Sequence, residues 1–220
     1  MFESAKNLLL LVSALFPIVN PLGNSPIFLA LTREHSPVQR RALSRRIAFS
    51  SFFLLVGSYF IGRYILSFFG ISIPVVQVGG GLIVISTGWT MLKEPDVDAH
   101  GEVQQEGQQQ DPLRQAFYPL TLPLTVGPGA ISVAITLGAN AVHHQGVNLV
   151  AMVGAVIAAA LIALSVYLCY AFADRLAQVL GATAMSVILR LSSFLLVCIG
   201  VQILWNGASA LLASLPVRAH

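Results

Sequence analysis

Charged side chains are scarce in this sequence, where Asp, Glu, Lys and Arg together make up only 10% of the 220 residues. Soluble globular domains carry about 25% charged residues. Hydrophobic residues account for 56% of the chain, and its mean hydropathy is +0.79. This balance excludes an ordinary soluble domain. It predicts an all-α integral membrane protein, because helices satisfy their own backbone hydrogen bonds in lipid.

Cysteine and catalytic groupings are also scarce. The two cysteines, Cys169 and Cys198, lie inside apolar runs, so we expect small buried side chains and neither a disulfide nor a metal site. No long apolar run contains an Asp–Asp, Ser–His or His–Glu pair suited to catalysis. We therefore predict that the protein is not an enzyme and has no cofactor.

What the sequence does have is long apolar runs. A helix needs about 20 mostly apolar residues to cross the hydrocarbon core of a bilayer. Six runs meet this condition, and they cover residues 7–32, 47–69, 74–92, 116–142, 147–172 and 186–213. The sequence thus predicts six transmembrane helices, with the lipid bilayer as their surroundings.

The basic side chains fall mainly in the loops after the first, third and fifth of these runs. They are Arg33, Arg40, Arg41, Arg45, Arg46, Lys93, Arg114 and Arg175. Because Lys and Arg concentrate in cytoplasmic loops, we place these three loops in the cytoplasm and both chain termini on the periplasmic side. The Arg cluster is therefore a topology signal and not a nucleic-acid patch, and we predict no nucleic-acid partner despite the net charge of +3.

One polar stretch divides the chain into two parts. Residues 93–115 are rich in Asp, Glu and Gln, a composition that cannot bury a core. We interpret them as a cytoplasmic linker between a first three-helix repeat, residues 1–92, and a second, residues 116–220. Because three is an odd number, the second repeat enters the membrane inverted relative to the first.

Two patterns indicate such an inverted repeat. GGLIVISTG, residues 80–88, aligns without gaps with SSFLLVCIG, residues 192–200. The first run of each half is also interrupted near its centre. The interruptions are at Pro17, Asn20, Pro21, Gly23 and Pro26 in the first half, and at Pro123, Gly127, Pro128 and Gly129 in the second. Paired interruptions at corresponding positions point to the binding site of a transporter.

A broken helix exposes backbone groups that can bind a ligand. The half-helix after the break presents free N–H groups and a positive dipole, and the half before it presents free carbonyls. We expect Ser25 to cap a half-helix starting at Pro26, and Gly127 to precede one starting at Pro128. Neutral polar side chains accompany the breaks at Asn20, Asn24, Ser25, Thr121 and Thr125.

A site of this kind is neutral but strongly dipolar. It suits a small zwitterion, with its carboxylate at a half-helix N-terminus and its ammonium near carbonyls, or a neutral polar solute. The broken runs contain no carboxylate, which argues against a carboxylate proton relay. The coupling ion, H⁺ or Na⁺, stays open. The alternative interpretation is a pair of plain proline kinks without a ligand.

The two interrupted stretches also resemble a known family. NPLGNSPIFL, residues 20–29, and PLTVGPGA, residues 123–130, are similar to two signatures of the MarC family of bacterial inner-membrane proteins. FGISIP at 69–74, GGLIV at 80–84, RL at 190–191 and FLLVCIGVQ at 194–202 also match the family pattern. Ser192 and Ser193 depart from it, because many relatives carry Met-Gly there.

The resemblance implies a secondary transporter of small neutral amino acids such as glycine and alanine. It also implies a 3+3 inverted repeat whose helices 1 and 4 are discontinuous. The substrate-binding residues carried over are Asn20, Pro21, Gly23, Asn24, Thr125, Gly127, Pro128 and Gly129, and the capping interpretation adds Ser25. The alternatives are a passive channel or an exporter of another small polar solute or a drug.

Overall fold

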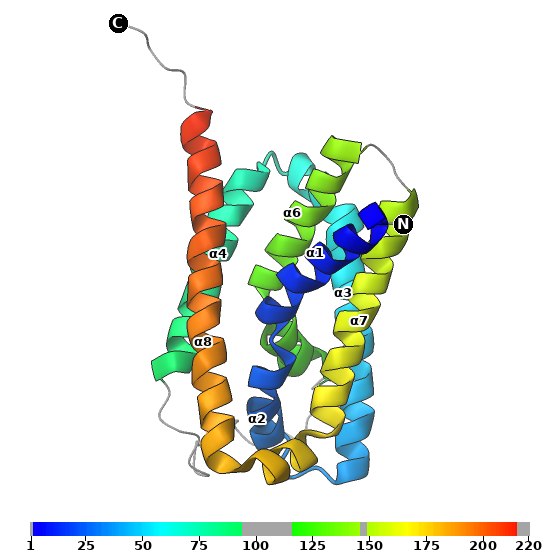
Figure 1. Ribbon diagram of the computed structural model, residues 1–220, viewed down its shortest axis with the longest axis vertical. Helices are drawn as coiled ribbons and strands as arrows, with labels where there is room; N and C mark the ends of the chain where they lie inside the picture. Colours follow the sequence, from blue (N-terminus) through cyan, green and yellow to red (C-terminus); the bar gives the residue numbers. More distant parts are fainter. Residues whose placement is uncertain (1, 94–115, 146–148, 215–220) are drawn as a thin grey trace, which may run out of the picture.

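The computed structural model describes residues 2–93, 116–145 and 149–214, and every regular element within them is a helix (Figure 1). In chain order the helices are α1 (Phe2–Val19), α2 (Pro21–Leu31), α3 (Pro37–Phe68), α4 (Ile73–Lys93), η1 (Ala116–Thr125), α6 (Pro128–Gln145), α7 (Leu149–Ala171) and α8 (Ala173–Ala213). The predicted all-helical class is confirmed. The linker predicted at residues 93–115 lies outside the described residues, except for its first residue, which ends α4.

Five stretches of the described helices are long and apolar enough to cross a membrane, namely Leu8–Leu31, Pro37–Phe68, Ile73–Lys93, Leu149–Ala171 and Thr183–Ala213. A sixth candidate is the pair Ala116–Thr125 and Pro128–Ala141, whose two parts are bent by 67° relative to each other. The six predicted runs therefore match these candidates in number and order when the bent pair is taken as one span.

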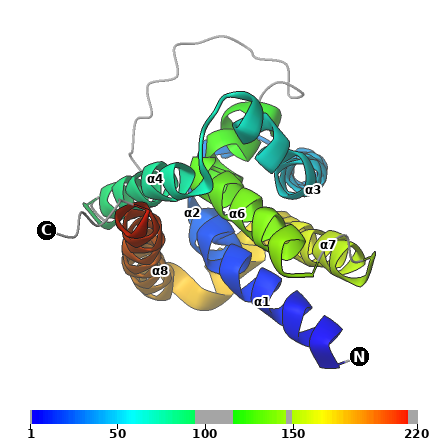
Figure 2. The same ribbon diagram turned by 90° about the horizontal axis from the view of Figure 1, so that it is seen from above.

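The interrupted helices lie in the middle of the bundle. Seen from above, α2 and α6 occupy the centre, with α4 and α8 on one side and α3 and α7 on the other, while α1 runs outward from α2 to the edge of the bundle (Figure 2). Helix α2 packs against α8 and α7, while α6 packs against α3 and α4. Each broken element thus contacts both of the flanking helix pairs.

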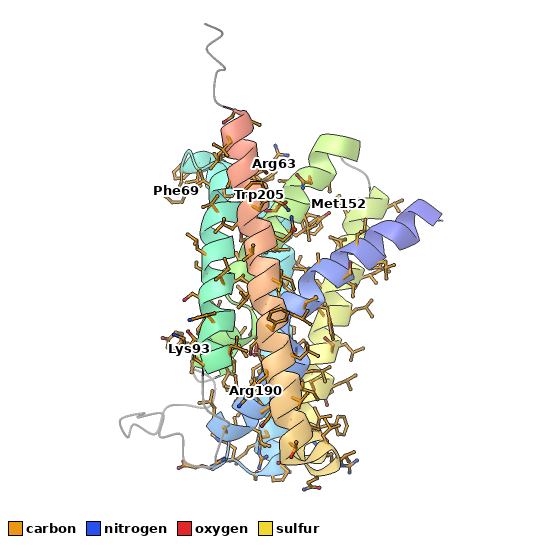
Figure 3. All side chains as sticks on the ribbon, turned by 60° about the vertical axis from the view of Figure 1, so that its left-hand side comes forward. Arg63, Phe69, Lys93, Met152, Arg190 and Trp205 are labelled. Atoms are coloured by element: carbon orange, nitrogen blue, oxygen red, sulfur yellow. The ribbon has the colours of Figure 1, made fainter. Side chains whose placement is uncertain are left out.

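Most of the described basic residues lie at one end of the bundle. Lys93 and Arg190 lie at that end, whereas Arg63, Phe69 and Trp205 lie toward the other (Figure 3). The start of α3 lies at the same end as Lys93, while the last turn of α8 lies at the opposite end (Figure 1). The start of α3 and the end of α4 therefore share one end, which agrees with the predicted grouping of the basic loops, while Arg114 lies outside the described residues.

Helix α3 begins ten residues before the apolar run that identified it. Ser36 is its N-cap, with the Gln39 N–H donating to the Ser36 hydroxyl and the Ser36 N–H donating to the Gln39 amide oxygen. Pro37 follows at the first helical position. This capping box fixes the start of the helix, so that its first turns carry arginines and only the later turns are apolar.

The outer surface of the bundle is apolar, as a bilayer requires. Large apolar side chains are exposed on α3, α7 and α8, for example Phe53, Leu164 and Val201. Cys198 is also exposed and Cys169 is half-buried, and both thiols are unpaired. The expectation of two buried cysteines was therefore wrong for Cys198, because its position on α8 faces away from the neighbouring helices.

Helices α4 and α8 run antiparallel in close contact through glycines. A Cβ added at Gly88 would meet the Ser193 carbonyl oxygen at 2.8 Å, and one at Gly81 would meet the Gly200 carbonyl oxygen, also at 2.8 Å. Gly207 approaches the Pro74 carbonyl in the same way. Small residues let helix backbones approach in lipid, where no hydrophobic force drives helices together.

This contact generates a prediction for Gly200→Ala. The new methyl group would lie 2.7 Å from the backbone nitrogen of Ile85 and 2.9 Å from the carbonyl oxygen of Gly81. We expect a loss of about 1–3 kcal/mol in the free energy of unfolding, because the backbone contacts cannot yield. Thermal unfolding in detergent measures the change. Gly79→Ala is the matched control, since nothing lies within 4 Å of its added Cβ, and equal melting temperatures for the two variants would contradict the packing.

Candidate functional site

The first break is a single left-handed residue. Helix α1 ends at Val19, Asn20 has φ 48° and ψ 57°, and α2 begins at Pro21. The Gly23 N–H donates to Oδ1 of Asn20 at 3.1 Å, so Asn20 is the N-cap of α2. Asn is among the few residues that adopt this conformation at low cost, and Pro suits the first helical position.

The helix therefore restarts five residues earlier than we expected. Ser25 is not an N-cap, and Pro26 lies inside α2. Both Ser25–Pro26 and Asn20–Pro21 fit the sequence pattern of a polar cap followed by proline. Asn20 is the cap in the structure because it both turns the backbone and caps the restarted helix. Helix α2 can therefore begin directly after α1.

Asn24 repairs the backbone at the same break. The Val19 carbonyl would accept from the Gly23 N–H in a continuous helix. Because that N–H is turned toward Asn20, the Asn24 side chain donates to the Val19 oxygen instead, at 3.0 Å. The two Asn side chains thus replace one backbone hydrogen bond.

The second break is wider. Within η1, both Tyr118 and Leu122 lie outside helical backbone geometry. The hydroxyls of Thr121 and Thr125 donate to the carbonyls five residues before them, each at 2.7 Å. Helix α6 then begins at Pro128, directly after Gly127, which is the start that the sequence predicts.

The structure brings the two breaks together. Nδ2 of Asn24 donates to the Leu124 carbonyl at 2.9 Å, across 100 residues of sequence. Asn20, Pro21, Gly23, Asn24, Ser25 and Thr125 are all buried at this junction. Side chains of one broken helix thus satisfy backbone groups of the other.

Three of the predicted site residues on the second break are placed differently. Pro128 is exposed and Gly127 is half-buried. Gly129 is buried against α4, where an added Cβ would collide with the Val84 side chain. These residues shape the start of α6 and its packing on α4, whereas the contact with the first break comes from Leu124.

The polar groups at the junction of the two breaks, Asn20, Asn24, Ser25 and Thr125, form a cluster. Tyr170 of α7 also belongs to this cluster, and the sequence analysis missed it. Its hydroxyl lies 3.0 Å from the Thr125 hydroxyl and also close to the Asn24 side chain. Its ring stacks on Phe28 of α2, with centroids 4.5 Å apart and an interplanar angle of 8°. Ser25 binds α7 as well, donating to the Cys169 carbonyl at 3.2 Å.

The sequence signal for Tyr170 is weak. A tyrosine near the end of a membrane span is typical of the aromatic belt at the lipid–water boundary. Only the rotation of α7 about its axis turns this ring inward, where it is 1% exposed. The cluster therefore draws on three elements, α2, η1 and α7, and not on the two breaks alone.

One donor in the cluster is unused. Asn20 is 7% exposed, and its Nδ2 has no hydrogen-bond partner within the described residues. A buried amide N–H without a partner costs about 1–3 kcal/mol. The cluster itself contains no ionisable group except the Tyr170 phenol, while the N-terminus of α2 contributes a positive dipole end.

A hollow of about 270 Å³ lies between α2 and α8, on the side of the break toward the basic end. It is lined by Pro26, Leu29, Ala30, Arg33, Ala177, Gly181, Met185, Ser186 and Leu189. Gly181 has φ 73° and ψ 169°, which interrupts the first part of α8 beside this hollow.

The chain is similar to a family of membrane proteins over nearly its whole length. Residues 5–212 match the model of the MarC family, described as integral membrane proteins. The membrane protein YvbG of Bacillus subtilis is 33% identical over 197 residues, covering 88% of this chain and 90% of the relative. The inner membrane protein MarC of Salmonella typhimurium is 32% identical over 200 residues, with the same coverage. No solved structure gives a significant match.

The hydrogen bond between Tyr170 and Thr125 generates a prediction for Tyr170→Phe. This variant keeps the stacked ring and removes only the hydroxyl, which leaves Thr125 with one partner fewer. We expect the free energy of unfolding to fall by about 0.5–1.5 kcal/mol. Thermal or denaturant unfolding in detergent measures it. Tyr167→Phe is the matched control on the same helix, and a loss of equal size in the control would contradict the assignment.

Proposed function

This chain belongs to the MarC family of integral membrane proteins, and we propose that it is a secondary transporter of small neutral amino acids, such as glycine and alanine, in the inner membrane. The observation that carries the proposal is the hydrogen bond from Asn24 to the Leu124 carbonyl, which joins the two helix breaks directly. Buried breaks of this kind are where transporters bind substrates. Two unrelated proline kinks are not expected to form a hydrogen bond with each other.

The chemistry of the cluster suits a zwitterion. The unused Nδ2 of Asn20, beside the N-terminus of α2, is a donor for a carboxylate. The carbonyls of Val19 and Leu124 both accept from Asn24, and an ammonium group would compete for them once that side chain turns away. In this proposal, substrate binding replaces hydrogen bonds that the groups of the cluster make with one another.

The space at the cluster favours a small substrate. A Cβ added at Gly23 would collide with the Asn20 side chain. The rings of Phe28 and Tyr170 close the other side and are both almost fully buried. Glycine and alanine have side chains small enough for such a site, whereas a drug-sized solute would need a cavity of several hundred Å³.

The α4–α8 contacts support the inverted repeat. In the alignment of residues 80–88 with residues 192–200, Gly88 corresponds to Gly200 and Gly81 to Ser193. The contact of Gly88 with Ser193 is therefore the counterpart of the contact of Gly200 with Gly81, and both occur. A two-fold axis in the membrane plane interchanges the two repeats and therefore produces such a pair of corresponding contacts. Rocking of one repeat against the other then gives alternating access.

We orient the bundle with its basic end in the cytoplasm and both termini in the periplasm. Residues 93–115 are then a cytoplasmic linker. The hollow between α2 and α8 lies on this side of the break, and we infer that it forms the approach to the break. The coupling ion is H⁺ or Na⁺, and transport under imposed gradients distinguishes them.

The first test is transport by purified protein in proteoliposomes. We expect saturable counterflow of labelled glycine into vesicles loaded with alanine, and much weaker exchange with leucine, which is too large for the cluster. Flux that rises linearly with concentration would favour a passive channel. Absence of both uptake and counterflow for every small neutral amino acid would overturn the proposal.

The second test removes the unused donor with Asn20→Gly. Glycine adopts the positive φ of this position, so the backbone of the break is kept. We expect the half-saturating glycine concentration to rise at least about tenfold, because a hydrogen bond to a charged group contributes about 1.5–3 kcal/mol. Counterflow kinetics measure it. Asn206→Ala, an exposed amide on α8, is the control and should not change the kinetics. Unchanged affinity in Asn20→Gly would argue that this amide does not contact the substrate.

A further inference from the structure

Most arginines at the basic end of the bundle have partners in the folded chain. Arg40 pairs with Asp174. Arg41 and Arg175 each lie 5.8 Å from the centre of the Phe172 ring. These contacts hold the start of α3 against the junction of α7 and α8. The three positive charges therefore interact with groups of the chain itself.

Arg45 and Arg46 differ from these neighbours. Both are exposed on α3, and within residues 2–93, 116–145 and 149–214 neither has an ion-pair partner or an aromatic ring beneath its guanidinium. They are consecutive on α3, and both border the same hollow, so that two positive charges act on it. Two uncompensated guanidinium groups attract an anion, and their planar donors fit phosphate oxygens.

These two residues border a hollow between α3 and η1. Its volume is about 420 Å³, and its lining is Arg45, Arg46, Phe49, Ser50, Ala116 and Phe117. Phe49 is 65% exposed and Phe117 is 47% exposed. The hollow therefore combines two basic residues with two aromatic rings, and Ser50 is a further polar residue of its lining.

The position of the hollow along α3 matches the boundary of a bilayer. The charged part of α3 ends at Arg46, and the apolar run starts at Ile47. Because a helix rises about 1.5 Å per residue, Phe49 lies about one turn and Phe53 about two turns deeper than the arginines. Phe53 is 54% exposed on the same surface. The basic groups are thus at headgroup depth, with aromatic rings along the path of an acyl chain.

We propose that this hollow binds an anionic phospholipid, with its phosphate on Arg45 and Arg46 and an acyl chain along Phe49, Phe117 and Phe53. Basic pockets between helices on the cytoplasmic side of membrane proteins bind anionic headgroups. A free phosphate ion would use only the arginines and gain nothing from the rings. The bound lipid contacts the start of η1 and so braces the element that leads into the second break.

The test is native mass spectrometry of the full-length protein with phosphatidylglycerol or phosphatidylcholine at equal concentrations. We expect phosphatidylglycerol to bind at least about tenfold more tightly. The double variant Arg45→Gln/Arg46→Gln should lose at least about tenfold of this affinity, since each basic residue near the surface contributes about 1 kcal/mol. Arg41→Gln/Arg175→Gln changes the net charge equally and should lose less than about threefold. Phe117→Ala should weaken lipid binding as well.

Four results would overturn the proposal. The first is unchanged phosphatidylglycerol binding in Arg45→Gln/Arg46→Gln. The second is equal loss in the two double variants, which would indicate attraction by overall charge only. The third is binding of inorganic phosphate that competes fully with the lipid and is insensitive to Phe117→Ala, which would identify a free-anion site. The fourth is lipid binding that appears only after the carboxylates of residues 94–111 are changed to amides, which would identify that acidic segment as the occupant. All four readouts are independent of transport.

Discussion

The structure depends on satisfying the backbone where helices are interrupted inside an apolar bundle. Lipid offers no partner to a free N–H or C=O, so each break must be repaired by side chains or by a neighbouring helix. Asn20 and Asn24 repair the first break, and the hydroxyls of Thr121 and Thr125 repair the second. The bond from Asn24 to the Leu124 carbonyl makes the two repairs a single unit.

The surrounding helices are arranged around this unit. α4 and α8 form one flank through glycine contacts, and α3 and α7 form the other, with the broken elements between them. α7 also contributes directly, because Tyr170 contacts both Thr125 and Phe28. Helix α7 therefore both packs against the breaks and supplies one member of the polar cluster. A movement of α7 relative to α2 or η1 would directly alter the contacts within the cluster.

Most of the described arginines lie at one end of the bundle, and they make two kinds of contact. Arg40, Arg41 and Arg175 bind groups of the chain itself and join its first half to the α7–α8 junction. Arg45 and Arg46 face outward beside aromatic rings. Because the interior cluster is almost free of ionisable groups, the proposed binding of a zwitterion would involve no large desolvation cost for a fixed protein charge.

The sequence alone determined the features that depend on local chemistry. The apolar runs fixed the spans, because crossing a bilayer requires length and hydropathy. Proline and glycine marked both breaks, and Pro128 marked the start of α6. The sequence could not choose between Asn20 and Ser25 as the cap of α2, since both precede a proline. Only the tertiary structure decided that Asn20 is the cap of α2. It also decided the inward rotation of Tyr170, the packing of Gly129 on Val84 and the exposure of Cys198. These depend on how each helix is turned about its axis, and that rotation is set by contacts between residues far apart in the chain.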